Sequence, residues 1–222
     1  MRYIQRQSTM ARTVHWVHTI ACISLFITGV LIYVPSIANS LGVDALQVSR
    51  MIHRVAAALF IAIPLIAVVL KPSAFGHKLK EYFAPWTAED KEFMKKFLPY
   101  LFAPKKIHMP KQDRYKSGQK VADMAVILFS ILIAVSGAFM WGAKFFAPEL
   151  VRWMYVLHDG SMIMLGVLLI AHVYVGAGIF QPYRGSARLM FGDGKIAVTD
   201  AKYHWGFWAE QELKDGTNVS EG

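Results

Sequence analysis

VRWMYVLHDGSMIMLGVLLIAHVYVGAGIF, residues 151–180, is the stretch that decides the fold. It is an apolar run longer than the roughly 20 residues that a helix needs to cross a bilayer. Two histidines, His158 and His172, lie within it. Ionisable side chains are rare inside such spans and usually mark function, so the segment predicts a membrane helix that contributes to a functional site.

Three further apolar blocks, residues 14–34, 51–70 and 121–141, precede this one. Of the 222 residues, 55% are hydrophobic and 18% are charged, and that charged fraction is low for a soluble domain. The sequence therefore predicts an all-α integral membrane protein, a four-helix transmembrane bundle over residues 1–180 with a tail over residues 181–222. The first block follows basic residues as a signal peptide would, but its length and the three later blocks favour a retained helix.

The formal net charge of +9 is unevenly distributed along the chain. Lys and Arg gather in the N-terminal segment, in the long loop 71–120 and in the tail, whereas the short connections after the first and third blocks hold few. By the positive-inside rule both termini and the long loop are cytoplasmic. This placement explains the basic charge without nucleic acid, and the aromatic residues of the loop predict one or two amphipathic helices on the membrane surface or on a partner.

The chain has one cysteine, Cys22, in the first apolar block. Cysteine ligation of an Fe–S cluster is therefore excluded, and the sequence has no C-x-x-C-H site for covalent haem attachment. Any haem must be held by other ligands.

The histidines inside or at the edges of the apolar blocks form two levels. His158 and His172 are fourteen residues apart, which is about 21 Å along a helix and close to four turns, so both point to nearly one face. His53 begins the second block, level with His158, and His15 or His18 begins the first, level with His172. Facing neutral imidazoles at two depths are typical of six-coordinate haem iron, whereas a structural zinc ion needs four ligands close together.

The pattern also predicts residues that would contact bound haem. Arg12, Arg54 and Arg152 lie where haem propionates would emerge, with interfacial anchoring as the alternative role. Small residues are needed where a flat haem approaches backbone, and ordinary helix packing through small residues is the alternative for each. The glycines in question are Gly29, Gly137, Gly160, Gly166, Gly176 and Gly178.

Several motifs resemble the cytochrome b (gamma) subunit of respiratory membrane-bound formate dehydrogenases, within a wider dihaem b-type cytochrome family that includes the NiFe-hydrogenase cytochrome b. Arg12-Thr13-Val14-His15-Trp16 is similar to its R-x-x-H-W opening, and Arg50-Met51-Ile52-His53 to the start of its second helix. The run from Arg114 to Lys120, RYKSGQK, resembles its K-Y-N-x-G-Q-K segment, with Lys116 where that family has Asn. The spacing of His158 and His172 and the stretch from Arg184 to Met190 also match.

The resemblance implies two haem b groups, an inner one held by His15 and His172 and an outer one held by His53 and His158. It leaves no assigned role for His18. It also implies a cytoplasmic site for menaquinone or ubiquinone beside the inner haem, with Gly118 and Gln119, and further Tyr115, Lys116 and His172, as contact candidates.

The function implied is electron transfer in the respiratory chain across a bacterial or archaeal cytoplasmic (inner) membrane, from a periplasmic partner to quinone. The partners implied are an Fe–S subunit and a molybdenum or tungsten formate dehydrogenase subunit. The alternatives are the cytochrome b of a NiFe hydrogenase or of another periplasmic oxidoreductase, and a membrane anchor without redox function.

Overall fold

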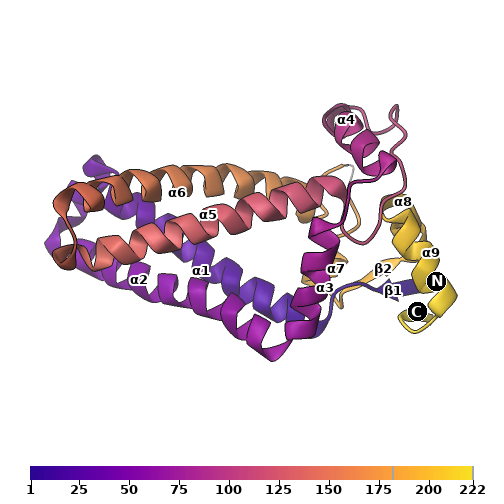
Figure 1. Cartoon of the computed structure of the whole chain (residues 1–222), viewed down its shortest axis with the longest axis horizontal. Coiled ribbons are helices and arrows are strands. Elements are labelled where there is room, and N and C mark those ends of the chain that lie inside the picture. The colour runs from indigo at the N-terminus through magenta and orange to yellow at the C-terminus, as the bar shows by residue number, and fades with distance from the viewer. Residues whose placement is uncertain (182, 222) are drawn as a thin grey trace. The chain divides into compact units, whose positions relative to one another are not determined.

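The chain is mostly helical and adds one small sheet, as the computed structural model in Figure 1 shows for residues 1–181 and 183–221. The helices are α1 (Thr9–Tyr33), α2 (Pro35–Leu70), α3 (Pro72–Phe83), α4 (Ala88–Phe102), α5 (Ser117–Trp141), the 3-10 turn η1 (Ala143–Phe145), α6 (Pro148–Gly176), α7 (Arg188–Phe191), α8 (Val198–His204) and α9 (Gly206–Asp215). The strands are β1 (Arg2–Gln5), β2 (Lys195–Ala197) and β3 (Val219–Glu221).

Four helices, α1, α2, α5 and α6, are long and apolar enough to cross a membrane. Each covers most of one predicted apolar block, with α1 ending one residue and α6 four residues before the predicted end, so the prediction of four membrane helices is confirmed. The largest difference is α2, which has 36 residues and begins at Pro35, where a proline suits the first helical position. The sequence did not predict its first part because residues 35–50 mix polar and apolar side chains and form no continuous apolar block. Gly42 interrupts the helix there with φ 76°.

The chain divides into two compact units. The membrane unit comprises Thr13–Gly76 and Phe129–Gly166, and the terminal unit comprises Met1–Arg12, His77–Leu128 and Val167–Gly222. Helices α5 and α6 contribute to both units, because each has one end in the terminal unit.

The interior of the membrane unit is lined mainly by small residues. Its buried positions include Ala21, Thr28, Gly29 and Ala56, while large apolar side chains such as Ile27 and Val55 are more than half exposed. Outward-facing apolar side chains are what a helix presents to lipid, because hydrocarbon replaces water as the solvent there.

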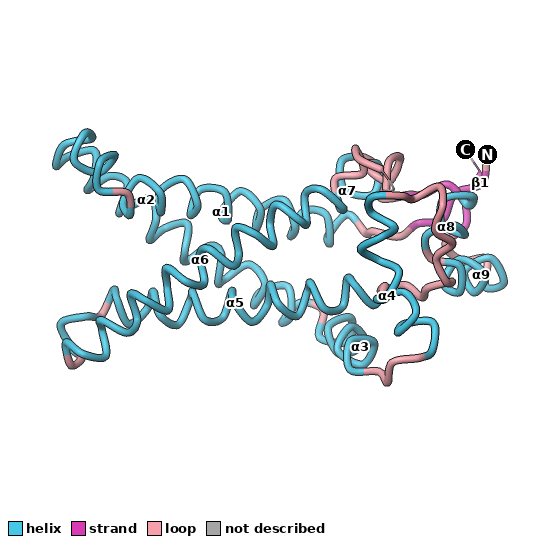
Figure 2. The backbone as a smooth tube through the Cα atoms, turned by 90° about the horizontal axis from the view of Figure 1, so that it is seen from above, coloured by secondary structure: helices cyan, strands magenta, loops and turns pink. Residues whose placement is uncertain are grey.

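The terminal unit is built around a three-stranded antiparallel sheet in the order β2-β1-β3, drawn in magenta in Figure 2. Tyr3 pairs with Ala197 on one side and with Ser220 on the other, so the two ends of the chain lie side by side. Ile4, Ile196 and Trp208 belong to the buried cluster beneath. The sequence predicted only helices, because strands of three or four residues joined across most of the chain leave no alternating pattern to recognise.

Helix α4 is fixed against the beginning of α5 by polar contacts. Thr87 and Asp90 form a reciprocal capping box at the start of α4, which satisfies two of its unpaired backbone donors. The other oxygen of Asp90 accepts a hydrogen bond of 2.6 Å from the buried Ser117 hydroxyl, at the first residue of α5. The two helix starts are therefore joined through one carboxylate.

Gly194, in the turn before β2, is expected to be essential to the terminal unit. It has φ 81°, and a Cβ there would lie 2.1 Å from the Gln7 carbonyl oxygen, while its own carbonyl accepts from the amides of Arg6 and Gln7. Gly194→Ala should therefore destabilise the sheet by more than the ~1–2 kcal/mol that a left-handed residue costs. Limited proteolysis of the tail in membranes is the measurement.

Gly216, which ends α9, provides a matched control. It also has positive φ (71°), but no atom lies within 4 Å of its Cβ position. The tail of the Gly216→Ala variant should be cleaved by protease only slightly faster than the wild-type tail. Equal protease sensitivity of the two variants would contradict the assignment of a steric clash at Gly194.

Candidate functional site

His53 of α2 and His158 of α6 face each other inside the membrane unit. Their ring centroids are 6.3 Å apart, and the ring planes are inclined by 60°. Two imidazoles bound on opposite sides of one metal ion would have centroids about 6 Å apart, because each metal–nitrogen bond is about 2 Å and each ring centre lies about 1 Å behind its nitrogen. The two rings thus have the separation that axial ligands of one iron require.

The hydrogen bonds of the two rings determine which nitrogen of each ring keeps a free lone pair. The Thr28 hydroxyl donates to the Ser24 carbonyl (2.7 Å), so its oxygen accepts from Nδ1 of His53 at 2.8 Å. Nδ1 of His158 donates to the Ile133 carbonyl at 3.1 Å, with the Ser136 hydroxyl 3.2 Å away. With Nδ1–H satisfied in both rings, Nε2 keeps its lone pair for a metal, the arrangement by which neighbouring groups orient metal-binding histidines.

A glycine lies against each ring, next in sequence to the hydroxyl residue. A Cβ at Gly29 would lie 3.7 Å from Cε1 of His53, and one at Gly137 would lie 3.1 Å from Cε1 of His158. Each ring therefore has the same pair of neighbours, a hydroxyl residue near its Nδ1 and a glycine that leaves room for the ring. The pairs are Thr28-Gly29 on α1 and Ser136-Gly137 on α5. The hydroxyls were missed in the sequence, although a polar residue followed by glycine inside an apolar helix was the available signal.

The remaining glycines have varied surroundings. Gly166 lies against the Phe26 ring and Gly176 against His172, while Gly160 has open space around its Cβ position. Gly178 has positive φ and lies against the backbone of Ala187. One further feature is the buried Ser161 hydroxyl, one turn beyond His158, which has no hydrogen-bond partner within the described residues. An unsatisfied hydroxyl on this side of α6 fits an interior that is completed by a bound group.

His15 and His18 have different surroundings on α1. The ring of His18 stacks on Phe60 of α2, with centroids 4.3 Å apart. His15 makes an edge contact with its neighbour Trp16. His172 is exposed on α6 and belongs to the terminal unit, whereas His15 belongs to the membrane unit, so their pairing stays a prediction.

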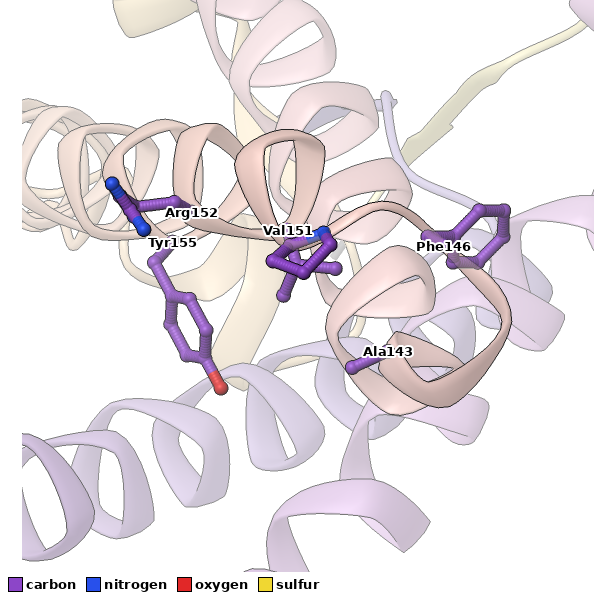
Figure 3. A pocket seen from close by; sticks show the side chains of 6 residues that line it. Ala143, Phe146, Val151, Arg152 and Tyr155 are labelled. Atoms are coloured by element: carbon purple, nitrogen blue, oxygen red, sulfur yellow. The ribbon is translucent and has the colours of Figure 1, made fainter.

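The three predicted propionate partners occupy different positions. Arg12 donates to the Gly192 carbonyl and to Thr9 Oγ1. The Arg54 guanidinium lies 5.8 Å from the Trp141 ring centre. Arg152 lines an open pocket of about 370 Å³ together with Phe146 and Tyr155, as Figure 3 shows. A propionate role for these arginines stays a prediction.

Four of the five predicted quinone contacts lie around the first turn of α5, and the fifth, His172, lies near the end of α6. Gly118 packs against Phe93 of α4, where a Cβ would be 3.2 Å from the ring. Tyr115 makes an edge contact with Tyr82, with centroids 5.3 Å apart. The half-buried Gln119 side chain has no hydrogen bond to any described residue, so its amide is available to a ligand.

Lys116 has the most enclosed side chain of this group. Its amine lies 3.4 Å from Nδ1 of His204 and over the rings of Tyr183 and Trp205, at 4.2 and 4.6 Å from their centres. Burial and the charge of Arg6 lower the pKa of Lys116 well below its ordinary value. The aromatic faces offset part of the desolvation cost of the cation.

Arg6 is the second buried cation of the terminal unit. Its guanidinium lies over Trp205 and Trp208, at 4.0 and 4.8 Å from the ring centres, and donates to the Arg114 carbonyl at 2.5 Å. Burial and the neighbouring Arg114 lower the pKa of Arg6 to about 9, so it stays charged at neutral pH. Arg6 and Lys116 thus hold the N-terminal segment, the start of α5 and the tail together.

The four membrane-length helices define a helical membrane protein. The model of the prokaryotic cytochrome b561 family matches residues 6–193, and the chain belongs to this family. Membership makes haem b its cofactor and electron transport in a bacterial inner membrane its setting.

Two relatives illustrate the similarity. The formate dehydrogenase cytochrome b556(fdo) subunit of Escherichia coli K12 is 29% identical over 112 residues, which cover 49% of this chain and 50% of that protein. The chain therefore spans about half the length of this relative. The formate dehydrogenase cytochrome b556 subunit of Haemophilus influenzae is 26% identical over 217 residues, covering 95% of this chain and 84% of that protein.

The terminal unit is expected to lose stability in acid because His204 is buried as a neutral ring. Burial, with the charges of Lys116 and Arg6, lowers the pKa of His204 from 6.5 to about 3. Between these values the unfolded chain binds a proton that the native chain does not, so the free energy of unfolding falls by up to ~1.4 kcal/mol per pH unit as the pH drops below 6.5. Hydrogen exchange of the β1 amides, corrected for intrinsic rates, measures this loss.

His204→Phe is the control, because Phe keeps the ring that stacks on Tyr183 with centroids 5.0 Å apart. Below pH 6.5, the free energy of unfolding of the variant should fall less steeply with pH, by the equivalent of about one bound proton. An unchanged slope would show that another group causes the acid loss.

Proposed function

We propose that this chain is the dihaem cytochrome b subunit of a membrane oxidoreductase, which passes electrons from a partner on the outer face to quinone at the basic, cytoplasmic end. The observation that carries the proposal is the pair His53 and His158, with centroids 6.3 Å apart and both Nδ1 atoms held by hydrogen bonds. A bilayer helix gains nothing from two such rings unless their second nitrogens have a partner.

We assign His53 and His158 to the outer haem and His15 and His172 to the inner haem. The surroundings of His18 support this choice, since its stacking on Phe60 gives it a packing role. Bound haem would supply one-electron oxidation and reduction at its iron, and the protein's part is to fix the ligands and exclude water around them.

The topology that we propose has both termini and the α3–α4 segment in the cytoplasm. Pairing of β1 with β3 supports a common side for the two ends, as does the even number of membrane helices among the described residues. Lys and Arg are concentrated in the same parts of the chain, as the positive-inside rule requires.

We propose that quinone binds beside the first turn of α5. Gln119 supports this site most directly, because its amide is without a hydrogen bond to the described residues, and Tyr115 offers an adjacent aromatic ring. Gly118 and Lys116 then act by fixing the start of α5 against Phe93 and against the Tyr183, Trp205 and His204 rings. His172 is the remaining contact candidate, at the end of α6.

The partners that we propose are an Fe–S subunit and a molybdenum or tungsten formate dehydrogenase subunit on the outer face. The names of the Escherichia coli and Haemophilus influenzae relatives support this choice. Identification of the subunits that co-purify tests it, and a hydrogenase in their place would replace formate as the electron source.

The histidine assignment predicts the haem content of four variants. His53→Phe and His158→Phe should each leave one haem per chain, His15→Phe should remove the other haem, and His18→Phe should keep two, because Phe can still stack on Phe60. Pyridine haemochrome content and reduced-minus-oxidised spectra of the purified chain are the measurements.

Three outcomes would contradict parts of this assignment. Loss of both haems or of neither in His53→Phe would reject the outer pair. Haem loss in His18→Phe with retention in His15→Phe would exchange the two ligands. A wild-type chain without haem would support the alternative of a membrane anchor without redox function.

Gln119→Leu should weaken quinone binding, because it removes one hydrogen bond worth about 1–2 kcal/mol. The expected result is a five- to thirtyfold higher KM for a soluble quinone, with unchanged haem content. Gln211→Leu on the exposed side of α9 is the matched control. Equal KM values for the two variants would count against the quinone site on α5.

A further inference from the structure

Asp123 is the acidic residue of α5, the seventh of the helix and so about 9 Å along its axis from the first. Its carboxylate accepts a hydrogen bond from the Tyr82 hydroxyl of α3, and the Lys78 amine lies 3.9 Å from the same oxygen. An ionisable group this far into a membrane-length helix is costly and is usually retained for function. The family assignment and the haem ligands leave Asp123 without a role.

The cluster around Asp123 runs from the protein interior to its surface. Tyr82 is 5% exposed, and its edge contact with Tyr115 connects it to the proposed quinone site. The Lys78 amine lies over the Tyr82 and Tyr115 rings, at 5.1 and 5.9 Å from their centres. The side chains of Asp123 and Lys78 are 26% and 42% exposed, so the outer end of the cluster lies at the protein surface.

Tyr82 acts in this cluster as a fixed donor. Burial and the neighbouring Asp123 charge raise the pKa of Tyr82 well above its ordinary value, so its hydroxyl keeps its proton. Lys78 is the cation that faces Asp123 from α3, and Tyr115 is the other titratable group beside it. The phenol therefore orients the carboxylate and leaves proton exchange to Asp123.

Asp123 lies on the same face of α5 as the proposed quinone contacts. Gln119 is four positions earlier, which is one helical turn, and Tyr115 is a further four positions back, just ahead of the helix. Gln119 and Asp123 share one face of α5, while Ser117 and Gly118 are turned toward α4. Tyr115 reaches the same cluster through its edge contact with Tyr82, which is bonded to Asp123. Proton transfer from Asp123 to a quinone held at Gln119 would cover about one helical turn.

We infer that Asp123 supplies protons from the aqueous surface to the quinone bound between Tyr115 and Gln119, with Tyr82 orienting its carboxyl group and Lys78 forming the solvent end of the path. This inference rests on the proposed quinone site. Reduction of one quinone takes up two electrons and two protons and gives one quinol. The electrons come through the proposed haem pair, and each proton passes from the Asp123 carboxylic acid to a quinone oxygen before the carboxylate is reprotonated from water.

The reverse half-reaction tests the inference without a partner enzyme. A soluble quinol is mixed with the oxidised, purified full chain, and the rate of haem reduction is followed from pH 5.5 to 9. Asp123→Asn keeps an oxygen that accepts from Tyr82 but binds no exchangeable proton, so haem reduction should slow at least tenfold. Asp123→Glu should recover most of the rate, and dithionite should reduce both chains to the same final spectrum.

Lys78 and Lys80 provide a matched pair on α3. Lys78→Met should shift the pH profile of haem reduction by quinol, because Lys78 faces Asp123. Lys80→Met, an exposed lysine without such a contact, should leave the profile unchanged. Tyr82→Phe should lower the rate less than Asp123→Asn, because its effect is only on orientation.

The outcomes separate the inference from the proposed function. If Asp123→Asn reacts at the wild-type rate with the wild-type pH profile, while Gln119→Leu is impaired, the quinone site stands and the proton path through Asp123 is rejected. If quinol fails to reduce the wild-type haem that dithionite reduces, the quinone site itself is rejected. If Asp123→Asn and Tyr82→Phe lower only the thermal stability, the Tyr82–Asp123 bond merely fastens α3 to α5 and the inference is overturned.

Discussion

The fold of the membrane unit depends on how a histidine ring is satisfied in hydrocarbon. Each imidazole has two nitrogens, and a bilayer offers no water to either, so an unsatisfied nitrogen would cost several kcal/mol. Thr28 and the Ile133 carbonyl satisfy one nitrogen of His53 and His158 respectively. The second nitrogen of each ring has a free lone pair, and under the proposed haem assignment an iron would use it; the small residues that line these helices fit that proposal.

The terminal unit buries basic side chains, which must be stabilised away from water. Arg6 and Lys116 are buried against Trp205, Trp208 and Tyr183, with no carboxylate of the described residues in contact with either cation. Aromatic faces and backbone carbonyls stabilise a cation less than a carboxylate does, but they introduce no negative charge. The arrangement joins three distant segments of the chain, and the lowered pKa of His204 is its consequence.

The sequence was most informative where a pattern is local. Long apolar runs predicted the four membrane helices, and the spacing of fourteen residues on α6 indicated that His158 and His172 share a face. The choice between His15 and His18 needed either a resemblance or the observation that His18 stacks on Phe60. Three features depend on residues far apart in sequence: the three-stranded sheet, the burial of Lys116 against the tail, and the hydrogen bond between Tyr82 and Asp123. Patterns of neighbouring residues do not predict such contacts.

The first turns of α5 show how these features combine. Ser117 and Gly118 are held by Asp90 and Phe93 of α4, and Lys116 is held by the tail through His204. Two sides of the helix are thereby fixed by protein contacts. The third side presents Gln119 and Asp123. Within the described residues, Gln119 has no hydrogen bond from its side chain, and Asp123 is bonded to Tyr82 and lies near Lys78. A rigid helix start with one polar side left for a ligand is what a site needs if bound quinone and proton donor are to keep a constant separation.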